Sequence, residues 1–143
     1  MEKHLTKLLC ATAAAFVFAN GYTQAPMPKI QQYGSTQFIS GGIGIDECKA
    51  LQTDACNWPL QLMFSEVQKG ATVGAWVADV DIKITDKDGN SVLSTISEGP
   101  IVLVKLPTGS YTLTANYLGK LATRTFTIQE GRSQTVSVYW VAK

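Results

Sequence analysis

Alternation of apolar and polar residues dominates the chain from residue 58 to its end. Leu60, Leu62 and Phe64 stand at every second position, and the same spacing recurs in each later segment. A period of two is the pattern of a β-strand that is buried on one face. No segment in this part has the 3.6-residue period of an amphipathic helix. The pattern therefore predicts an all-β fold for residues 58–143.

Turn-forming residues divide this part into seven predicted strands. Clusters of Gly, Pro, Asn and Asp recur about every ten residues, as in Asp86–Asn90, Glu98–Pro100 and Pro107–Gly109. The strands between them are predicted at residues 60–65, 76–85, 91–97, 101–106, 110–118, 122–128 and 133–141. Short strands at this spacing favour an antiparallel β-sandwich.

Two motifs carry a resemblance to a known family. The first is the run from Val77 to Gly89, an Ala-x-Val strand that enters an Asp-x-x-Gly turn, and the second is the corner Leu106-Pro-Thr-Gly-Ser-Tyr111. Over roughly residues 60–141 the chain resembles the carboxypeptidase regulatory-like domain, a transthyretin-like β-sandwich. It is also similar to small exported proteobacterial proteins of this class. The resemblance implies a seven-stranded transthyretin-like sandwich in which the ring of Tyr111 enters the core, and it implies no particular activity.

The N-terminus has the form of a secretory signal peptide. Lys3 and Lys7 precede the apolar run Leu8–Ala19, which is too short to cross a bilayer as a helix. Small residues allow cleavage between residues 19 and 25, so residues 1–21 are assigned to the signal peptide, with an uncleaved membrane anchor as the alternative. We therefore expect a periplasmic or secreted protein that has no stable membrane span after signal removal.

Residues 22–57 are predicted as an extended leader followed by a disulfide-closed segment. Asp46 is expected to cap a short helix over residues 46–52, and residues 53–55 are expected to turn the chain back. Cys48 and Cys56 are the two cysteines left after signal removal, which in an exported protein predicts a disulfide. That bond and an unbroken helix exclude each other, because eight residues of helix separate Cα atoms by about 12 Å. A metal site on the two thiols is the alternative.

Composition removes most enzyme classes. The chain has 12 basic and 11 acidic residues and one histidine, His4, so without residues 1–21 the charge is zero and no histidine remains. A neutral surface lacks the basic field that nucleic acids require, and a chain without histidine has neither a Ser-His-Asp triad nor most zinc sites. Asp79 and Asp81 are the carboxylate pair that a hydrolase would use. They alternate with core residues beside Lys83, which predicts that they face solvent instead.

The turn at residues 86–90 is tested against a calcium loop. Asp86, Asp88 and Asn90 have the spacing of the first three ligands, but Ser91 and Ser97 stand where such a loop needs Gly and Glu. These residues are therefore predicted to form a polar hairpin turn, with a surface calcium site as the alternative. No cofactor is predicted.

The outward-facing positions of the last strands suggest a binding surface. We expect them to form one hydroxyl-rich face if the strands are neighbours, and such a face with an aromatic ring suits a carbohydrate or a flat polar partner. Its candidate residues are Thr112, Thr114, Asn116, Thr123, Thr125, Thr127 and Tyr139, together with Thr135 and Ser137. Trp58, beside the cysteine segment, is expected to be partly exposed and is a further candidate binding residue, so the loops near Trp58 and residues 48–56 are the alternative contact surface. Trp76 and Trp140 fall in apolar registers and are predicted to lie in the core. Arg124 is expected at a sheet edge with its head in water.

These observations predict an exported, non-enzymatic β-sandwich module that binds a protein or a glycan in the bacterial envelope. One alternative is a structural or assembly component that pairs through an edge strand. A carboxylate-dependent hydrolase is a remote alternative. Neither nucleic acid nor a membrane is an expected partner.

Overall fold

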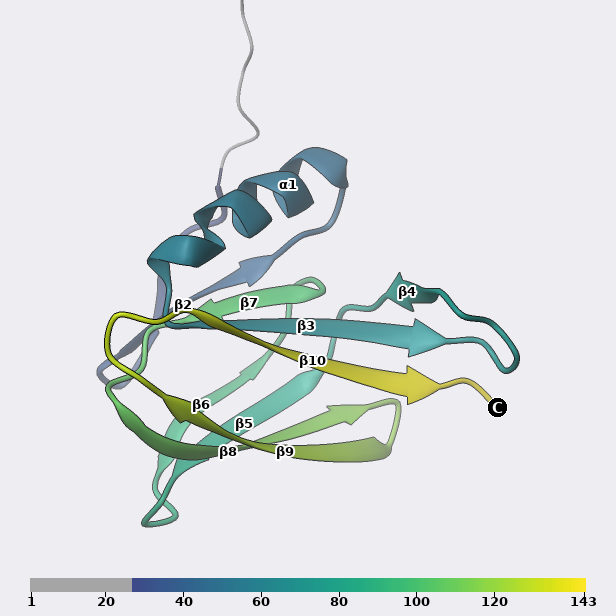
Figure 1. The fold of residues 1–143 in the computed structure, drawn as a ribbon. Helices are drawn as coiled ribbons and strands as arrows, with labels where there is room; N and C mark the ends of the chain where they lie inside the picture. Colours follow the sequence, from purple (N-terminus) through teal and green to yellow (C-terminus); the bar gives the residue numbers. More distant parts are fainter. Residues whose placement is uncertain (1–26) are drawn as a thin grey trace, which may run out of the picture.

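The computed structural model describes residues 27–143, which form two β-sheets packed face to face (Figure 1). The predicted signal peptide lies outside the described residues. The six-stranded sheet has the order β1–β2–β7–β3–β10, with β4 also paired to β3, and the four-stranded sheet has the order β6–β5–β8–β9. The strands are β1 (Gln31–Tyr33), β2 (Thr36–Gly41), β3 (Leu60–Val67), β4 (Gly74–Trp76), β5 (Asp81–Asp86), β6 (Ser91–Ile96), β7 (Ile101–Val104), β8 (Gly109–Tyr117), β9 (Lys120–Ile128) and β10 (Gln134–Val141).

The core lies between the two sheets and is filled by the alternating residues that the sequence indicates. Leu60, Leu62 and Phe64 of β3 meet Ile82 and other residues of the four-stranded sheet in one buried cluster. Tyr111 also lies in this cluster, as predicted, and its hydroxyl donates a hydrogen bond to the Pro107 carbonyl oxygen (2.7 Å). Burial and the negative charge of Asp86 both raise the pKa of the Tyr111 phenol. The all-β prediction is thus confirmed.

The strand count and the purely antiparallel arrangement are wrong. The described residues form ten strands, and β10 pairs with β3 in parallel along its whole length, from Gln134 opposite Leu60 to Val141 opposite Val67. Parallel neighbours need a long connection, and here the chain between β3 and β10 builds both sheets before it returns. Local turn signals do not reveal such a pairing.

The predicted leader supplies two strands of the six-stranded sheet. β2 pairs with β7, and its residues Phe38 and Ile39 are buried on opposite faces of the sheet. Gly41 lies directly against the backbone of Gly99, where a Cβ at Gly99 would clash with the Gly41 carbonyl. Close backbone approach is therefore the role of glycine at Gly99.

Helix α1 (Ile45–Asp54) covers part of the outer face of the six-stranded sheet. Its Leu51 is fully buried against Ile101 and Leu103 of β7 in a second apolar cluster. The helix begins one residue before Asp46, and no side-chain cap is present at Gly44, so the predicted cap at Asp46 is wrong. The Glu47 carboxylate instead accepts a hydrogen bond from the Gly42 backbone N–H (2.7 Å).

The predicted disulfide is absent, because the helix is not broken where the bond would require it. α1 continues to Asp54, and a 3₁₀ turn over Ala55–Asn57 follows. Cys48 is half-buried in the helix, Cys56 is exposed in the 3₁₀ turn, and both thiols are free. The chain does not turn back at residues 53–55, so the two sulfurs are not brought together.

The register of residues 76–84 differs from the prediction by one position at its start. Asp79 has a positive φ of 59°, and β5 begins only at Asp81. This local kink inserts one extra residue between the buried Val77 and the buried Val80, so Trp76 points to the outer face and is 52% exposed. The prediction of Trp76 as a core residue is therefore wrong, whereas Trp140 is buried as predicted.

Candidate functional site

The predicted threonine face exists in part on the four-stranded sheet. Thr112 pairs with Thr125 and Thr114 pairs with Thr123 across β8 and β9, so these strands are neighbours. Tyr139 does not join them, because β10 belongs to the other sheet. From here on, the threonine face means Thr112, Thr114, Asn116, Thr123, Thr125 and Thr127. It contains no aromatic ring, and on β5 it is bordered by Lys83, which pairs with Thr114.

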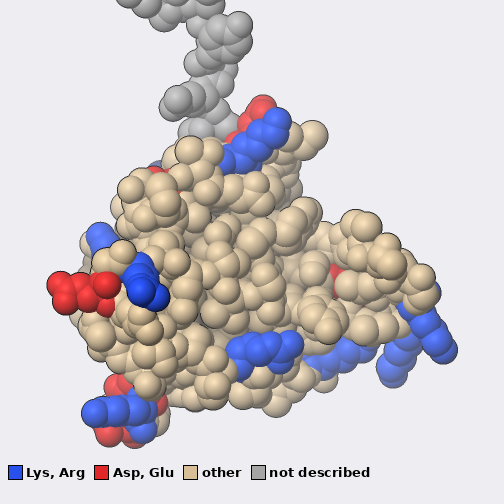
Figure 2. All heavy atoms as spheres, viewed as in Figure 1, with Lys and Arg blue, Asp and Glu red and all other residues tan. Residues whose placement is uncertain are grey.

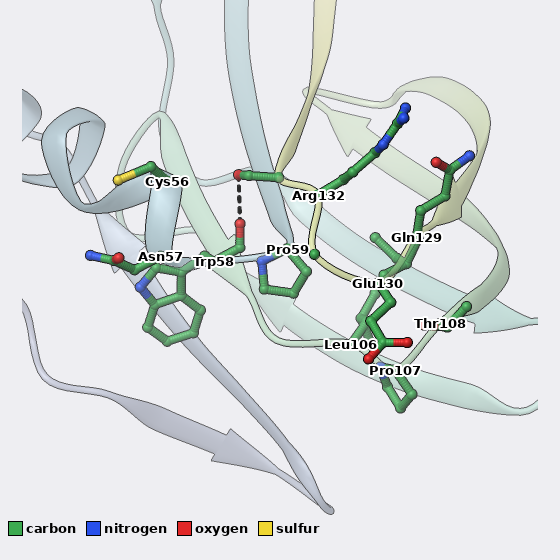
Figure 3. A pocket seen from close by; sticks show the side chains of 13 residues that line it. Cys56, Asn57, Trp58, Pro59, Leu106, Pro107, Thr108, Gln129, Glu130 and Arg132 are labelled. Carbon is green, nitrogen blue, oxygen red and sulfur yellow. Dashed lines mark hydrogen bonds between the residues drawn. The ribbon is translucent and has the colours of Figure 1, made fainter.

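A pocket lies at the end of the sandwich next to Trp58 and has a volume of about 480 Å³ (Figure 3). Trp58 is buried, which corrects the expected partial exposure. Its indole N–H donates to the Asp54 carboxylate (2.9 Å), its carbonyl accepts from the Ser133 hydroxyl (2.6 Å), and Lys105 Nζ lies 5.6 Å from its ring centroid. The ring is thus held in place by its neighbours, which indicates a structural role.

The polar side chains around this pocket do not converge. Glu130 and Arg132 belong to the loop between β9 and β10, and Figure 3 shows their side chains pointing apart. Cys56 points away from both of them. A reaction centre needs a nucleophile, a base and an oxyanion donor around one point. This arrangement does not provide such a set.

The Asp86 turn is closed by its own hydrogen bonds. Asp86 Oδ1 accepts from the backbone N–H groups of Asp88 and Asn90 (2.9 Å each), and Asp86 Oδ2 accepts from the Asn90 side-chain amide (3.3 Å). These donors lower the pKa of the Asp86 carboxyl, with the Asn90 backbone N–H as the largest cause. Within residues 27–143, no group of three or more His, Cys, Asp or Glu side chains is placed to hold a metal ion. The carboxylate oxygens are used by the turn, as the hairpin interpretation requires.

The outer face of the six-stranded sheet carries a surface that the sequence did not reveal. Gln61 and Met63 of β3 pair with Leu103 and Ile101, which pack against α1, so the odd-numbered residues of β3 lie on the outer face. Beyond the helix, no other element of residues 27–143 covers this face. We call it the open half. It consists of Met63, Ser65, Val67, Trp76, Ser137, Tyr139 and Val141.

Three of these residues stand side by side across three strands. Ser65 pairs with Trp76 of β4 on one side and with Tyr139 of β10 on the other. We call these three residues the aromatic row. Trp76 is 52% exposed and Tyr139 is 58% exposed, and the small Ser65 lies between them. Two large rings therefore flank a shallow polar floor.

An apolar groove joins the aromatic row at Trp76. It has a volume of about 530 Å³ and runs between the first turns of α1 and the segment Trp76–Ala78. Exposed Ile43 and Ile45, at the start of α1, line it on the helix side. Contiguous exposed apolar surface of this kind marks binding sites in soluble proteins. The open half and its groove are therefore the best candidate site on the described part of the chain.

Sequence reasoning found Tyr139 but missed Trp76 and Ser65. Trp76 is followed at every second position by apolar Ala78 and Val80, whereas Val77 is followed by charged Asp79, so the alternation favoured an inward Trp76. The signal that could have corrected it is the spacing of three between Val77 and Val80, which only a kinked strand accommodates.

A protein-family model matches part of the chain. The matching family model is described as the Rhizobiales growth-associated tandem repeat domain, and it covers residues 68–140, slightly more than half of the chain. The chain belongs to this family. A search of the curated proteins found no match. The part that matches the Rhizobiales growth-associated tandem repeat domain begins directly after β3, so β3, with which β10 pairs, lies outside it.

Residues 27–143 contain no helix that is long and apolar enough to cross a membrane. The longest helix of this part is α1, which has ten residues and buries only one face.

Proposed function

We propose that the protein is an exported, non-enzymatic β-sandwich module that binds a protein or glycan partner in the bacterial envelope through the open half. The observation that carries the proposal is the aromatic row. Trp and Tyr rings contribute large contact areas and are enriched at binding surfaces. Here two such rings lie more than half in solvent on a regular sheet, whose backbone is held by hydrogen bonds on both sides of β3.

The envelope location rests on the N-terminal pattern, which lies in residues outside the described part and is that of a signal peptide. Mass spectrometry of the protein isolated from cells should give an N-terminus between residues 20 and 26. An intact Met1 would contradict export by a cleaved signal.

The carboxypeptidase regulatory-like resemblance is part of the same proposal. What supports it is the corner at Pro107, where the Tyr111 hydroxyl bonds back to the Pro107 carbonyl within a mostly β fold. Domains of that class serve as binding and accessory modules, which agrees with a non-enzymatic role.

A photo-reactive residue tests the proposed binding face in intact cells. Benzophenone inserts into C–H bonds of proteins and sugars alike, so p-benzoylphenylalanine is placed at Tyr139 in one variant and at Thr125 in the other. We expect illumination to cross-link the tagged Tyr139 variant to envelope material, and we expect the cross-link to survive boiling in detergent. The Thr125 variant should give no cross-link. Adducts from Thr125 alone, or from neither position, would overturn the proposal.

A specific observation also favours assembly through an edge strand. Gln134 N–H donates to Pro59 O (3.1 Å) and Ala142 N–H donates to Val67 O (2.9 Å), so the even-numbered amides of β10 point to β3. The amides of Thr135, Ser137 and Tyr139 therefore point to the free edge. β10 carries no charged residue of its own, and Lys120 of β9 donates to the outward-facing Val141 carbonyl oxygen only at the C-terminal end of the strand (2.9 Å). Charges on edge strands oppose strand addition, and residues 135–139 carry none.

Proline scanning tests this second candidate. Ser137→Pro removes an N–H that faces the free edge and should abolish assembly in cross-linked extracts while the protein stays folded. Val136→Pro is the matched control, because it removes an N–H that bonds to β3 and should unfold the strand. Assembly that survives Ser137→Pro would rule out pairing through β10.

A further inference from the structure

The geometry of the aromatic row indicates what kind of ligand it takes. Trp76 and Tyr139 lie on strands that flank β3 and share one partner, Ser65, so their Cα atoms are two strand spacings apart, or about 10 Å. Both side chains leave the same face of a sheet. This arrangement is a flat platform with two rings, in contrast to a pocket that encloses one side chain.

The absence of charge on the open half narrows the class of ligand further. Its seven residues are apolar or carry hydroxyl groups, and none is charged. Figure 2 shows a broad uncharged area across the middle of the visible side of the molecule, with charged side chains at its margins. Anionic polymers bind through clustered Lys and Arg, which are absent here. A neutral ligand is therefore favoured.

Polar groups are interleaved with the rings. Ser65 lies between them, and Ser137 lies next along β10, opposite Met63. The unpaired backbone amides of Ser137 and Tyr139 line the edge beside the Tyr139 ring. Protein partners are held chiefly by side chains that enter desolvated pockets, and the apolar groove that could take one lies beside the row, between Trp76 and α1, and not between the two rings. A sugar ring has the complementary chemistry, with a C–H face that stacks on an aromatic ring and hydroxyl groups around its rim.

We propose that the aromatic row binds a neutral, extended β-linked glycan strand, whose sugar rings stack on Trp76 and Tyr139 while its hydroxyl groups bond to Ser65 and to the β10 edge. This inference rests on the proposed function and names its ligand class. Successive rings of a β-1,4-linked strand lie in a nearly flat ribbon, which fits two rings on one sheet face. An α-1,4-linked strand coils and does not present two flat rings in line.

Tryptophan fluorescence gives a direct test. Trp58 and Trp140 are 6% and 5% exposed, so Trp76 supplies the signal that a ligand on the surface can change. The purified protein is titrated with cellohexaose, chitohexaose and maltohexaose. We expect saturable binding of at least one of the two β-linked hexasaccharides, and binding of maltohexaose at least tenfold weaker.

Variants separate stacking from general effects. Trp76→Ala and Tyr139→Ala should each weaken binding at least tenfold, measured by calorimetry because the first variant has lost its reporter. Trp76→Phe should retain most of the affinity, since it keeps an aromatic face. Tyr33→Ala is the matched control, because Tyr33 is an exposed tyrosine on β1, at the opposite edge of the same sheet. Unchanged circular dichroism confirms that each variant is folded.

The outcomes distinguish this inference from the proposed function. If none of the three hexasaccharides binds while photo-adducts still form at Tyr139, the inference of a β-linked glycan is wrong, and the proposed binding face stands. If maltohexaose binds as tightly as the β-linked strands, the extended geometry is wrong. If none of the hexasaccharides binds and no photo-adduct forms at Tyr139, the inference and the proposed function are both wrong.

Discussion

The two halves of the outer face of the six-stranded sheet contrast with each other. In the covered half, Ile101 and Leu103 of β7 lie under α1, and Leu51 of the helix is fully buried against them. In the open half, the same sheet continues through β3, β4 and β10 with Trp76 and Tyr139 more than half exposed. One face of one sheet is thus core at one end and surface at the other.

This contrast separates stability from binding. Alternation places large apolar side chains on both halves, but only the covered half has an element of the described chain packed over it. Burying apolar area contributes about 25 cal/mol per Å², so an uncovered apolar face retains that free energy for a ligand. Substitutions in the covered half should therefore destabilise the fold, whereas those in the open half should weaken binding.

The largest effect is expected for Leu51→Ala. Removing a fully buried leucine side chain leaves a cavity between α1 and β7, which should lower the free energy of unfolding by about 2–5 kcal/mol. Urea unfolding measures it. The neighbouring exposed Gln52→Ala is the control and should change the free energy of unfolding by less than about 0.5 kcal/mol. Equal effects would mean that α1 does not stabilise the covered half.

Glu47→Ala should have a smaller effect at the start of the same helix. It removes the acceptor of the Gly42 N–H and should destabilise the protein by about 1 kcal/mol. Asp46→Ala changes the acidic neighbour, which makes no cap bond, and should cost only about 0.3 kcal/mol through the helix dipole. Thermal unfolding measures the stability of the two variants. A larger loss of stability for Asp46→Ala would mean that Asp46 does cap the helix, as the sequence predicted.

The open half should tolerate truncation. Trp76→Ala and Tyr139→Ala remove side chains that are more than half in solvent, so each should change the free energy of unfolding by less than about 1 kcal/mol. Chemical unfolding of both variants, measured together with Leu51→Ala, compares the stability effects in the two halves. A loss as large as that of Leu51→Ala would show that the aromatic row is structural.

The smallest effect is expected at the Asp86 turn, which lies on the other sheet and serves as a reference for both halves. Its folded pKa is lowered from 3.8, so its contribution to stability is complete above that value and is lost as the pH falls through the lower, folded pKa. Urea midpoints between pH 5 and pH 2 should show this loss in the wild type and less of it in Asp86→Asn. The loss of stability between pH 5 and pH 2 should be the same in Leu51→Ala and in Trp76→Ala. A difference between the two variants would show that the Asp86 turn is energetically coupled to one half of the outer face.

The sequence was informative where structure depends on neighbours along the chain. The turn at Asp86–Asn90, the burial of Tyr111 and the helix around Asp46–Gln52 all depend on residues within a few positions. Arg124 also lies on an edge strand as expected. For the turn, Tyr111 and the helix, the physical cause is local: a turn conformation or a periodic apolar face.

The candidate site depends on contacts that are distant along the chain. Ser65 meets Tyr139 only because β10 returns to pair with β3 in parallel, and Trp76 reaches the outer face only because Asp79 kinks the chain. The disulfide prediction was wrong for a related reason, since cysteine spacing alone does not tell whether a helix continues past Gln52. Long-range strand pairing and one unusual backbone torsion therefore determine the position of the aromatic row, which the alternation pattern alone does not.

Co-sedimentation with isolated cell envelopes tests the central claim most directly. The wild type is compared with the double variant Trp76→Ala/Tyr139→Ala in the open half and with Thr123→Ala/Thr125→Ala on the threonine face. We predict that the aromatic double variant loses at least tenfold in envelope binding while it remains folded, and that the threonine double variant binds like the wild type. Full retention of the aromatic double variant, or loss confined to the threonine double variant, would contradict the assignment of binding to the open half.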